Sequence, residues 1–273
     1  MNDQVSNPDV LKNTHPAPME KIQQAHDFMD SLELHEPVVP LQVANFVTST
    51  AANKEIESDS KGAYVNNGSL VTFVDGISAQ HKKDVLNSTL LAQLAATKKY
   101  DRYKDTEAWY KFYIDTLEKI GWVAQSFSFS EYQVSGSTFT VDKVVIDVLK
   151  AIASENEMAV VQETLKALEA LSDKDGKLVL FDSNSHHQGN GNFQIASARE
   201  ADGDVAVNLG AFYFDSTQNS TKVLFFEFKS SETNIFKGTE SAVLNEEVYS
   251  QVRDKIVTKL GGKIAQNVDE IEI

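Results

Sequence analysis

The sequence of 273 residues contains no cysteine. This absence excludes disulfide bonds, thiolate metal sites, cysteine nucleophiles and fatty acids attached through a thiol. Basic residues are also outnumbered: 25 Lys and Arg stand against 40 Asp and Glu, so the formal net charge is −15. Such a charge repels the phosphates of nucleic acids, and we expect no nucleic-acid partner.

Long apolar runs are missing as well. No stretch of about eighteen apolar residues occurs, so no segment is predicted to cross a bilayer as a helix. The N-terminus is polar and has neither the basic n-region nor the apolar h-region of a Sec signal peptide. We therefore expect a soluble protein that is either cytoplasmic or secreted by a route other than Sec.

What the sequence does contain is enough apolar material, 41% of its residues, to build a sizeable core. Residues 1–18 are predicted to be a flexible tail, and residues 19–121 a helical N-terminal region. Apolar spacing predicts helices at 19–34, 79–99 and 104–120. The small and polar segment 48–68 is typical of a loop, and 69–76 fits either a strand or the buried start of a helix.

The second half, residues 122–273, changes character. It is predicted to contain a strand, then a helix pair within 140–171 whose start Ser137 or Thr138 caps, then consecutive strands and a final helix at 245–260. The predicted strands lie at 122–134, 177–183, 191–200, 203–215, 221–231 and 234–243. The two regions either fold separately or form one compact domain over 19–273.

One strand is predicted to be apolar on both faces. In VLFFEF, Leu224, Phe226 and Phe228 point one way, whereas Val223, Phe225 and Glu227 point the other way. A strand of this kind is typically covered on both sides of its sheet.

The order of these elements resembles the Cyt cytolytic delta-endotoxins and the related Evf-type bacterial virulence factors over roughly residues 122–244. The segments that carry the likeness are TVDKVVIDVLKAIAS, MAVVQETLKALEAL, NFQIASAREADGDVAVNLGAFYF and VLFFEFKSSETNIFKG. The resemblance implies an α/β (α+β) fold in which a β-sheet is sandwiched between helical layers, here with a helical N-terminal half. It also implies membrane or lipid interaction without enzymatic chemistry. Some relatives carry a fatty acid on a cysteine, which this chain lacks.

The resulting hypothesis is a toxin-like or virulence protein that interacts with membranes, forming pores after a conformational change. Helices at 140–171 would cover the strands in the resting state. The alternative is a soluble binder of lipid or another hydrophobic ligand. Partners are then membrane lipids or such a ligand, with a homo-oligomer left open, and no cofactor beyond a non-covalent lipid or fatty acid. The candidate membrane residues are Phe212, Phe214, Leu224, Phe226, Phe228, Val145 and Leu149.

A separate polar cluster contains Asp182, His186 and His187, in a segment that is predicted to be a loop after a strand. Carboxylate and imidazole groups can bind metals, transfer protons or sense pH. The spacing matches no metal motif, and no G-x-S-x-G sequence exists, so we favour a solvated hairpin loop and expect no enzyme. An enzyme would require these three side chains to converge in a cleft.

Overall fold

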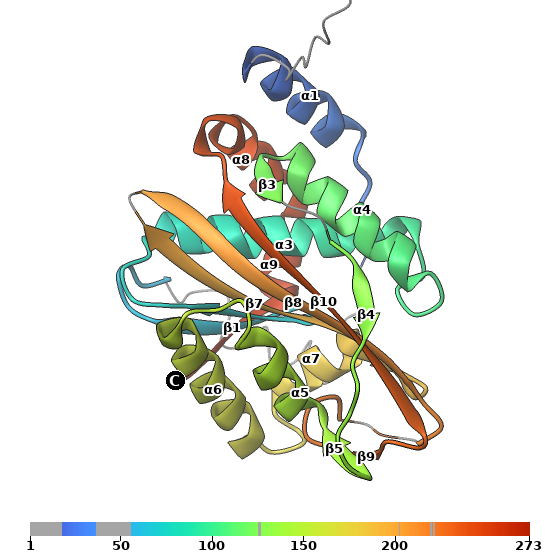
Figure 1. Cartoon of the computed structure of the whole chain (residues 1–273). Helices are drawn as coiled ribbons and strands as arrows, with labels where there is room; N and C mark the ends of the chain where they lie inside the picture. The colour runs from blue at the N-terminus through green and yellow to red at the C-terminus, as the bar shows by residue number, and fades with distance from the viewer. Residues whose placement is uncertain (1–17, 37–55, 125–126, 202, 219, 221) are drawn as a thin grey trace, which may run out of the picture.

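The computed structural model describes residues 18–36, 56–124, 127–201, 203–218, 220 and 222–273. A twisted nine-stranded sheet lies between two layers of helices (Figure 1). This α+β arrangement confirms the predicted sandwich of a sheet between helical layers. Residues 1–17 of the predicted N-terminal tail and residues 48–55 of the segment 48–68 lie outside the described residues.

The main sheet is mixed, because β2 and β7 run parallel whereas the other neighbours along it are antiparallel. Its order is β11-β1-β2-β7-β8-β10-β3, with β4 paired to β10 and β6 paired to β7. The long strands β7, β8 and β10 lie side by side. The bounds are β1 Gly62–Asn66, β2 Ser69–Phe73, β3 Trp122–Ala124, β4 Phe129–Glu131, β6 His186–His187, β7 Asn190–Ala201, β8 Asp204–Ser216, β10 Thr233–Leu244 and β11 Val268–Ile271.

One face of the sheet is covered by helices from both ends of the chain (Figure 1). In α4, Trp109 stacks on Tyr113 with ring centroids 5.4 Å apart, and both side chains are buried, as the apolar spacing predicts. Ser78 caps α3 by accepting the N–H of His81. The helices of this layer are α1 Pro18–Ser31, α3 Ala79–Lys99, α4 Thr106–Lys119, α8 Glu246–Leu260 and α9 Lys263–Asn267.

The opposite face is covered by α5 Val141–Leu149, α6 Glu155–Ala170 and α7 Gly176–Ser185. The predicted helix pair is confirmed, but the N-cap residue of α5 is Thr140, whose side chain makes no capping bond, rather than Ser137 or Thr138. Helix α6 begins with a capping box between Ser154 and Glu157. Among the helices of the described segments, none is both long and apolar enough to cross a membrane.

The predicted strand at 177–183 is wrong, because this segment forms α7. Asp175 caps the helix by accepting the N–H of Lys177 at 2.9 Å. A short apolar run such as KLVLF does not distinguish a strand from a buried helix by its periodicity. The loop predicted over 48–68 is also wrong at its end, where β1 forms. The open choice at 69–76 resolves to a strand, β2.

The aromatic segment VLFFEF is not an inner strand of the sheet. Within it, β9 (Glu227–Lys229) begins only at Glu227 and pairs with β5 (Thr138–Thr140) in a separate two-stranded sheet. The backbone just before β9 bonds elsewhere: Val223 N–H donates to the Asp182 carboxylate, and the Leu224 carbonyl accepts the N–H of Asp142. These tertiary bonds replace a strand ladder.

A buried ion pair joins α3 to α8. Asp84 is 0% exposed and accepts two bonds from Arg253, at 2.9 and 2.8 Å. Removing one partner of such a pair leaves an uncompensated buried charge. We expect Arg253→Met to lower the free energy of unfolding by about 3–5 kcal/mol. Urea denaturation will measure this loss, and Asp84→Asn combined with Arg253→Met should recover part of it. A loss below about 1 kcal/mol would contradict the assignment.

Candidate functional site

The candidate membrane residues meet in one apolar cluster between the sheet and the α5–α7 layer. Phe226 is half-buried, and the other six are almost fully buried. They come from distant parts of the chain: two from α5, two from β8 and three from the segment 224–228. The fold therefore brings the predicted membrane residues together, although their role at a membrane stays a prediction.

Aromatic rings run through this cluster in direct contact. Phe212 stacks on Phe193 of the neighbouring strand, with centroids 5.2 Å apart. Phe214 contacts Phe228 at 5.0 Å, and Phe226 contacts Phe228 at 4.7 Å. We call this group the aromatic cluster; its members are Phe139, Phe181, Phe193, Phe212, Phe214, Phe226 and Phe228.

Three members of the aromatic cluster, Phe139, Phe181 and Phe193, were missed by the sequence analysis. Phe193 and Ile195 alternate with the polar Gln194 in β7, and the register places Phe193 opposite Phe212. Its period-two spacing could have identified it. The same spacing could not identify Phe181, because the short apolar segment around it fits a strand as well as a helix.

Helix α5 packs closely on β8 because Gly210 has no side chain. A Cβ atom at this position would lie 3.0 Å from Leu149 Cδ2 and 2.9 Å from the ring of Phe212. The same face becomes polar toward one end. There Asn208 donates to the buried carboxylate of Glu157 at 2.9 Å and accepts from Ser241 at 2.7 Å. The covered face of β8 is therefore aromatic at one end and lined by hydrogen-bonded polar side chains at the other.

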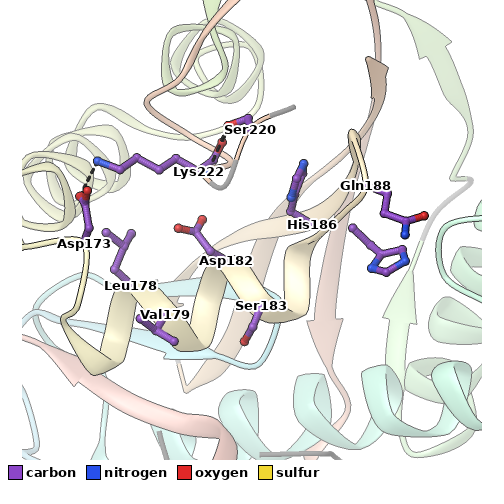
Figure 2. Close-up of a pocket in the computed structure, with 10 residues that line it drawn as sticks. Asp173, Leu178, Val179, Asp182, Ser183, His186, Gln188, Ser220 and Lys222 are labelled. Atoms are coloured by element: carbon purple, nitrogen blue, oxygen red, sulfur yellow. Dashed lines mark hydrogen bonds and ion pairs between the residues drawn. The ribbon is translucent and has the colours of Figure 1, made fainter. Parts of the chain in front are cut away.

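The polar cluster lies beside this region and lines a surface pocket of about 650 Å³ (Figure 2). Asp182 projects from α7, and His186 and His187 form β6, so the predicted loop after a strand is wrong. All three side chains line the pocket. The full lining consists of Asp173, Leu178, Val179, Asp182, Ser183, His186, His187, Gln188, Ser220 and Lys222.

The side chains of Asp182 and Lys222 in this pocket have different partners. Asp182 accepts the N–H of Val223 at 3.1 Å, and Lys222 forms an ion pair with Asp173. Burial raises the pKa of Asp182 to about 6, against the opposing effects of the Val223 N–H and Lys222. Burial also lowers the pKa of His186, which favours its neutral form. Within the described chain, His186 Nε2 is buried without a hydrogen-bond partner.

The raised pKa of Asp182 determines how the stability of the fold changes with pH. Since the pKa of Asp182 rises from 3.8 to about 6 on folding, its contribution to stability is fully present below pH about 4 and is lost as the pH rises through 6. Asp182→Asn keeps the acceptor oxygen and removes the charge. We expect its stability relative to the wild type to increase from pH 4 to pH 7 in urea denaturation. The exposed Asp173→Asn is the control, and an equal pH trend in both variants would contradict the prediction.

Comparison with known proteins gives similarity at the level of fold. No family model matches the sequence, and no curated protein matches it. Among solved structures, the chain is similar to one titled delta-endotoxin, with 15% identity, a TM-score of 0.39, and coverage of 66% of this chain and 81% of the other. It is also similar to the Evf virulence factor, with 11% identity, a TM-score of 0.33, and coverage of 82% and 88%. These are the two kinds of protein that the sequence resembles, and the likeness concerns the fold.

Proposed function

We propose that this protein is a toxin-like protein that acts on lipid membranes by exposing the sheet face now covered by α5 and α6. The observation that carries the proposal is the set of three adjacent strands β7, β8 and β10, which are 12, 13 and 12 residues long. A tilted strand of about 9–11 residues is long enough to cross a bilayer. These strands keep continuous antiparallel register, so the backbone groups that face each other between β7 and β8 and between β8 and β10 stay paired in an apolar medium.

The helical cover is attached mainly through apolar contacts. Its polar links include the buried Asn208–Glu157 hydrogen bond at 2.9 Å, a Lys61–Glu163 ion pair at 2.7 Å, whose side chains are 37% and 45% exposed, and a Tyr132–Asp147 hydrogen bond at the surface. Exposed ion pairs contribute about 0–1 kcal/mol. Lipid tails are as apolar as the side chains of the helices, so a bilayer can replace the contacts that the aromatic cluster makes with α5.

The test is dye release from phosphatidylcholine vesicles, because a net charge of −15 disfavours anionic lipid. The full chain is assayed from pH 4 to pH 8, with and without limited proteolysis. We expect concentration-dependent release under at least one of these conditions. No release under any of them would refute the proposal. A copurifying acyl chain in native mass spectrometry, without release, would instead favour a soluble lipid binder.

A further inference from the structure

A second pocket, of about 640 Å³, lies where α3 leads into α4 and collects basic groups in an acidic protein. Four of the 25 basic residues of the chain lie between positions 98 and 104. Lys98 and Lys99 end α3, and Arg102 follows in the connection to α4. We call this the basic pocket, and its charged or titratable lining consists of His35, Lys98, Lys99, Asp101, Arg102 and His187, with Tyr100 and Tyr103.

Arg102 is a buried cation with neutral partners. The residue is 6% exposed. Its Nη1 donates to the Asn184 carbonyl at 2.7 Å, its Nη2 donates to the Asn192 carbonyl at 2.9 Å, and its guanidinium lies 4.7 Å from the Trp109 ring. In the described part of the chain, no carboxylate forms an ion pair with it, and its Nε has no partner. A buried charge is normally paired with an opposite charge, whereas this guanidinium is balanced only by carbonyl oxygens and an aromatic ring.

Among the described lining residues, three basic side chains share the pocket with one carboxylate. Asp101, the acidic residue among the described lining, already accepts the N–H groups of Tyr103 and Lys104. Lys98 is 3.7 Å from Glu33, at the surface, and Lys99 lies over the Phe112 ring at 4.2 Å. Two lysines in the last turn also suit the partial negative charge of a helix end, but that effect does not account for a buried arginine.

We propose that the basic pocket binds a phosphate-class anion, with Arg102 as the fixed positive charge at its base and Lys98 and Lys99 as flexible countercharges. The carbonyls of Asn184 and Asn192 hold the guanidinium in place, and the ammonium groups of the lysines add charge without fixed geometry. The anion is either a free phosphate or the phosphate of a lipid headgroup. This inference does not depend on membrane lysis, because phosphate binding is measured without vesicles.

Trp109 provides the readout, since its ring lies 4.7 Å from the Arg102 guanidinium. The background variant Trp122→Phe removes the other tryptophan of the chain. Inorganic phosphate is titrated into the full-length protein, with sodium chloride of matched ionic strength as the control. We expect a saturable change in fluorescence with phosphate that chloride does not reproduce.

Paired substitutions then locate the site. Lys98→Gln with Lys99→Gln should weaken phosphate binding about tenfold or more, the scale of a lost charge-assisted contact. Lys143→Gln with Lys150→Gln removes the same charge from exposed positions on and beside α5, and should change the affinity less than about twofold. Arg102→Lys, checked for folding by circular dichroism, should weaken binding because a lysine keeps the charge but cannot be held in place by both the Asn184 and the Asn192 carbonyl. If Arg102→Lys does not fold, the difference in phosphate affinity between the two lysine-pair variants is the test.

A second titration identifies the source of the anion. Glycerophosphocholine that competes with inorganic phosphate would indicate a lipid headgroup, whereas a response to inorganic phosphate alone would indicate a free anion. Absence of a saturable response to either compound would overturn the proposal. Equal losses of affinity in the two lysine-pair variants would overturn it as well, because they would show a general charge effect.

Discussion

A disulfide between positions 138 and 229 is expected to abolish dye release from phosphatidylcholine vesicles, and reduction with dithiothreitol is expected to restore it. Thr138 and Lys229 are direct partners in the β5–β9 pair, and both side chains are exposed. Opposed residues of an antiparallel pair have Cβ atoms about 4.5–5.5 Å apart, near the spacing of a disulfide. β5 leads directly into α5, so Thr138→Cys with Lys229→Cys holds the start of the cover in place.

The matched control is a disulfide that leaves the cover free. Val123 and Val243 are direct partners in the β3–β10 pair and are 60% and 43% exposed. Val123→Cys with Val243→Cys joins two strands that the proposal keeps paired, so the oxidised control should release dye like the wild type. Because the chain has no cysteine of its own, each variant forms one defined bond. Full release by the oxidised 138–229 variant would show that α5 need not leave.

Phe212→Ala is expected to lower the free energy of unfolding by about 3–5 kcal/mol, the usual cost of truncating a buried phenylalanine. Phe212 is 0% exposed, stacks on Phe193 and lies against Gly210 beneath α5. Phe226→Ala is the comparison, because Phe226 belongs to the same aromatic cluster but is half-buried.

Urea denaturation will measure both phenylalanine variants, and we expect a loss of about 1–2 kcal/mol for Phe226→Ala. The larger loss for Phe212→Ala would show that the proposed membrane face stabilises the resting fold. Equal and small losses would mean that the apolar cluster contributes little to stability.

The regular elements could be predicted because their residues repeat with one period over many positions. Helix α3 occupies the predicted residues 79–99, and β7, β8 and β10 lie within about two residues of their predicted bounds. Alternation over twelve residues fixes both the strand and its faces. In these elements, local sequence and tertiary packing favour the same structure.

The short apolar segments could not be predicted, because distant residues decide their structure. KLVLF becomes helical where Asp175 caps it, and VLFFEF leaves the main sheet where Asp182 and Asp142 bond its backbone. The sequence of β1 is typical of a polar loop. In the fold, Asn66 is nevertheless buried, and its amide donates to the Leu86 carbonyl and to Thr89. Its partner β11 lies at the other end of the chain.

The residues of the candidate sites likewise differ in how far the sequence predicts them. The apolar residues of β8 were predicted from their strand pattern, and the fold adds Phe193 through its register with Phe212. Arg102 carried no such signal, because an arginine in a polar connection is ordinarily exposed. Its burial depends on Trp109, Asn184 and Asn192, which come from α4, α7 and β7.

Hydrogen exchange in the presence of phosphatidylcholine vesicles tests the central claim most directly, under the conditions that release dye. Amide protection reports which elements open and which remain bonded. We expect the amides of α5 and α6 to lose protection when vesicles are added, while the amides of β7, β8 and β10 keep it. Unchanged protection of α5 and α6 during dye release would contradict the account, as would loss of protection in the three strands.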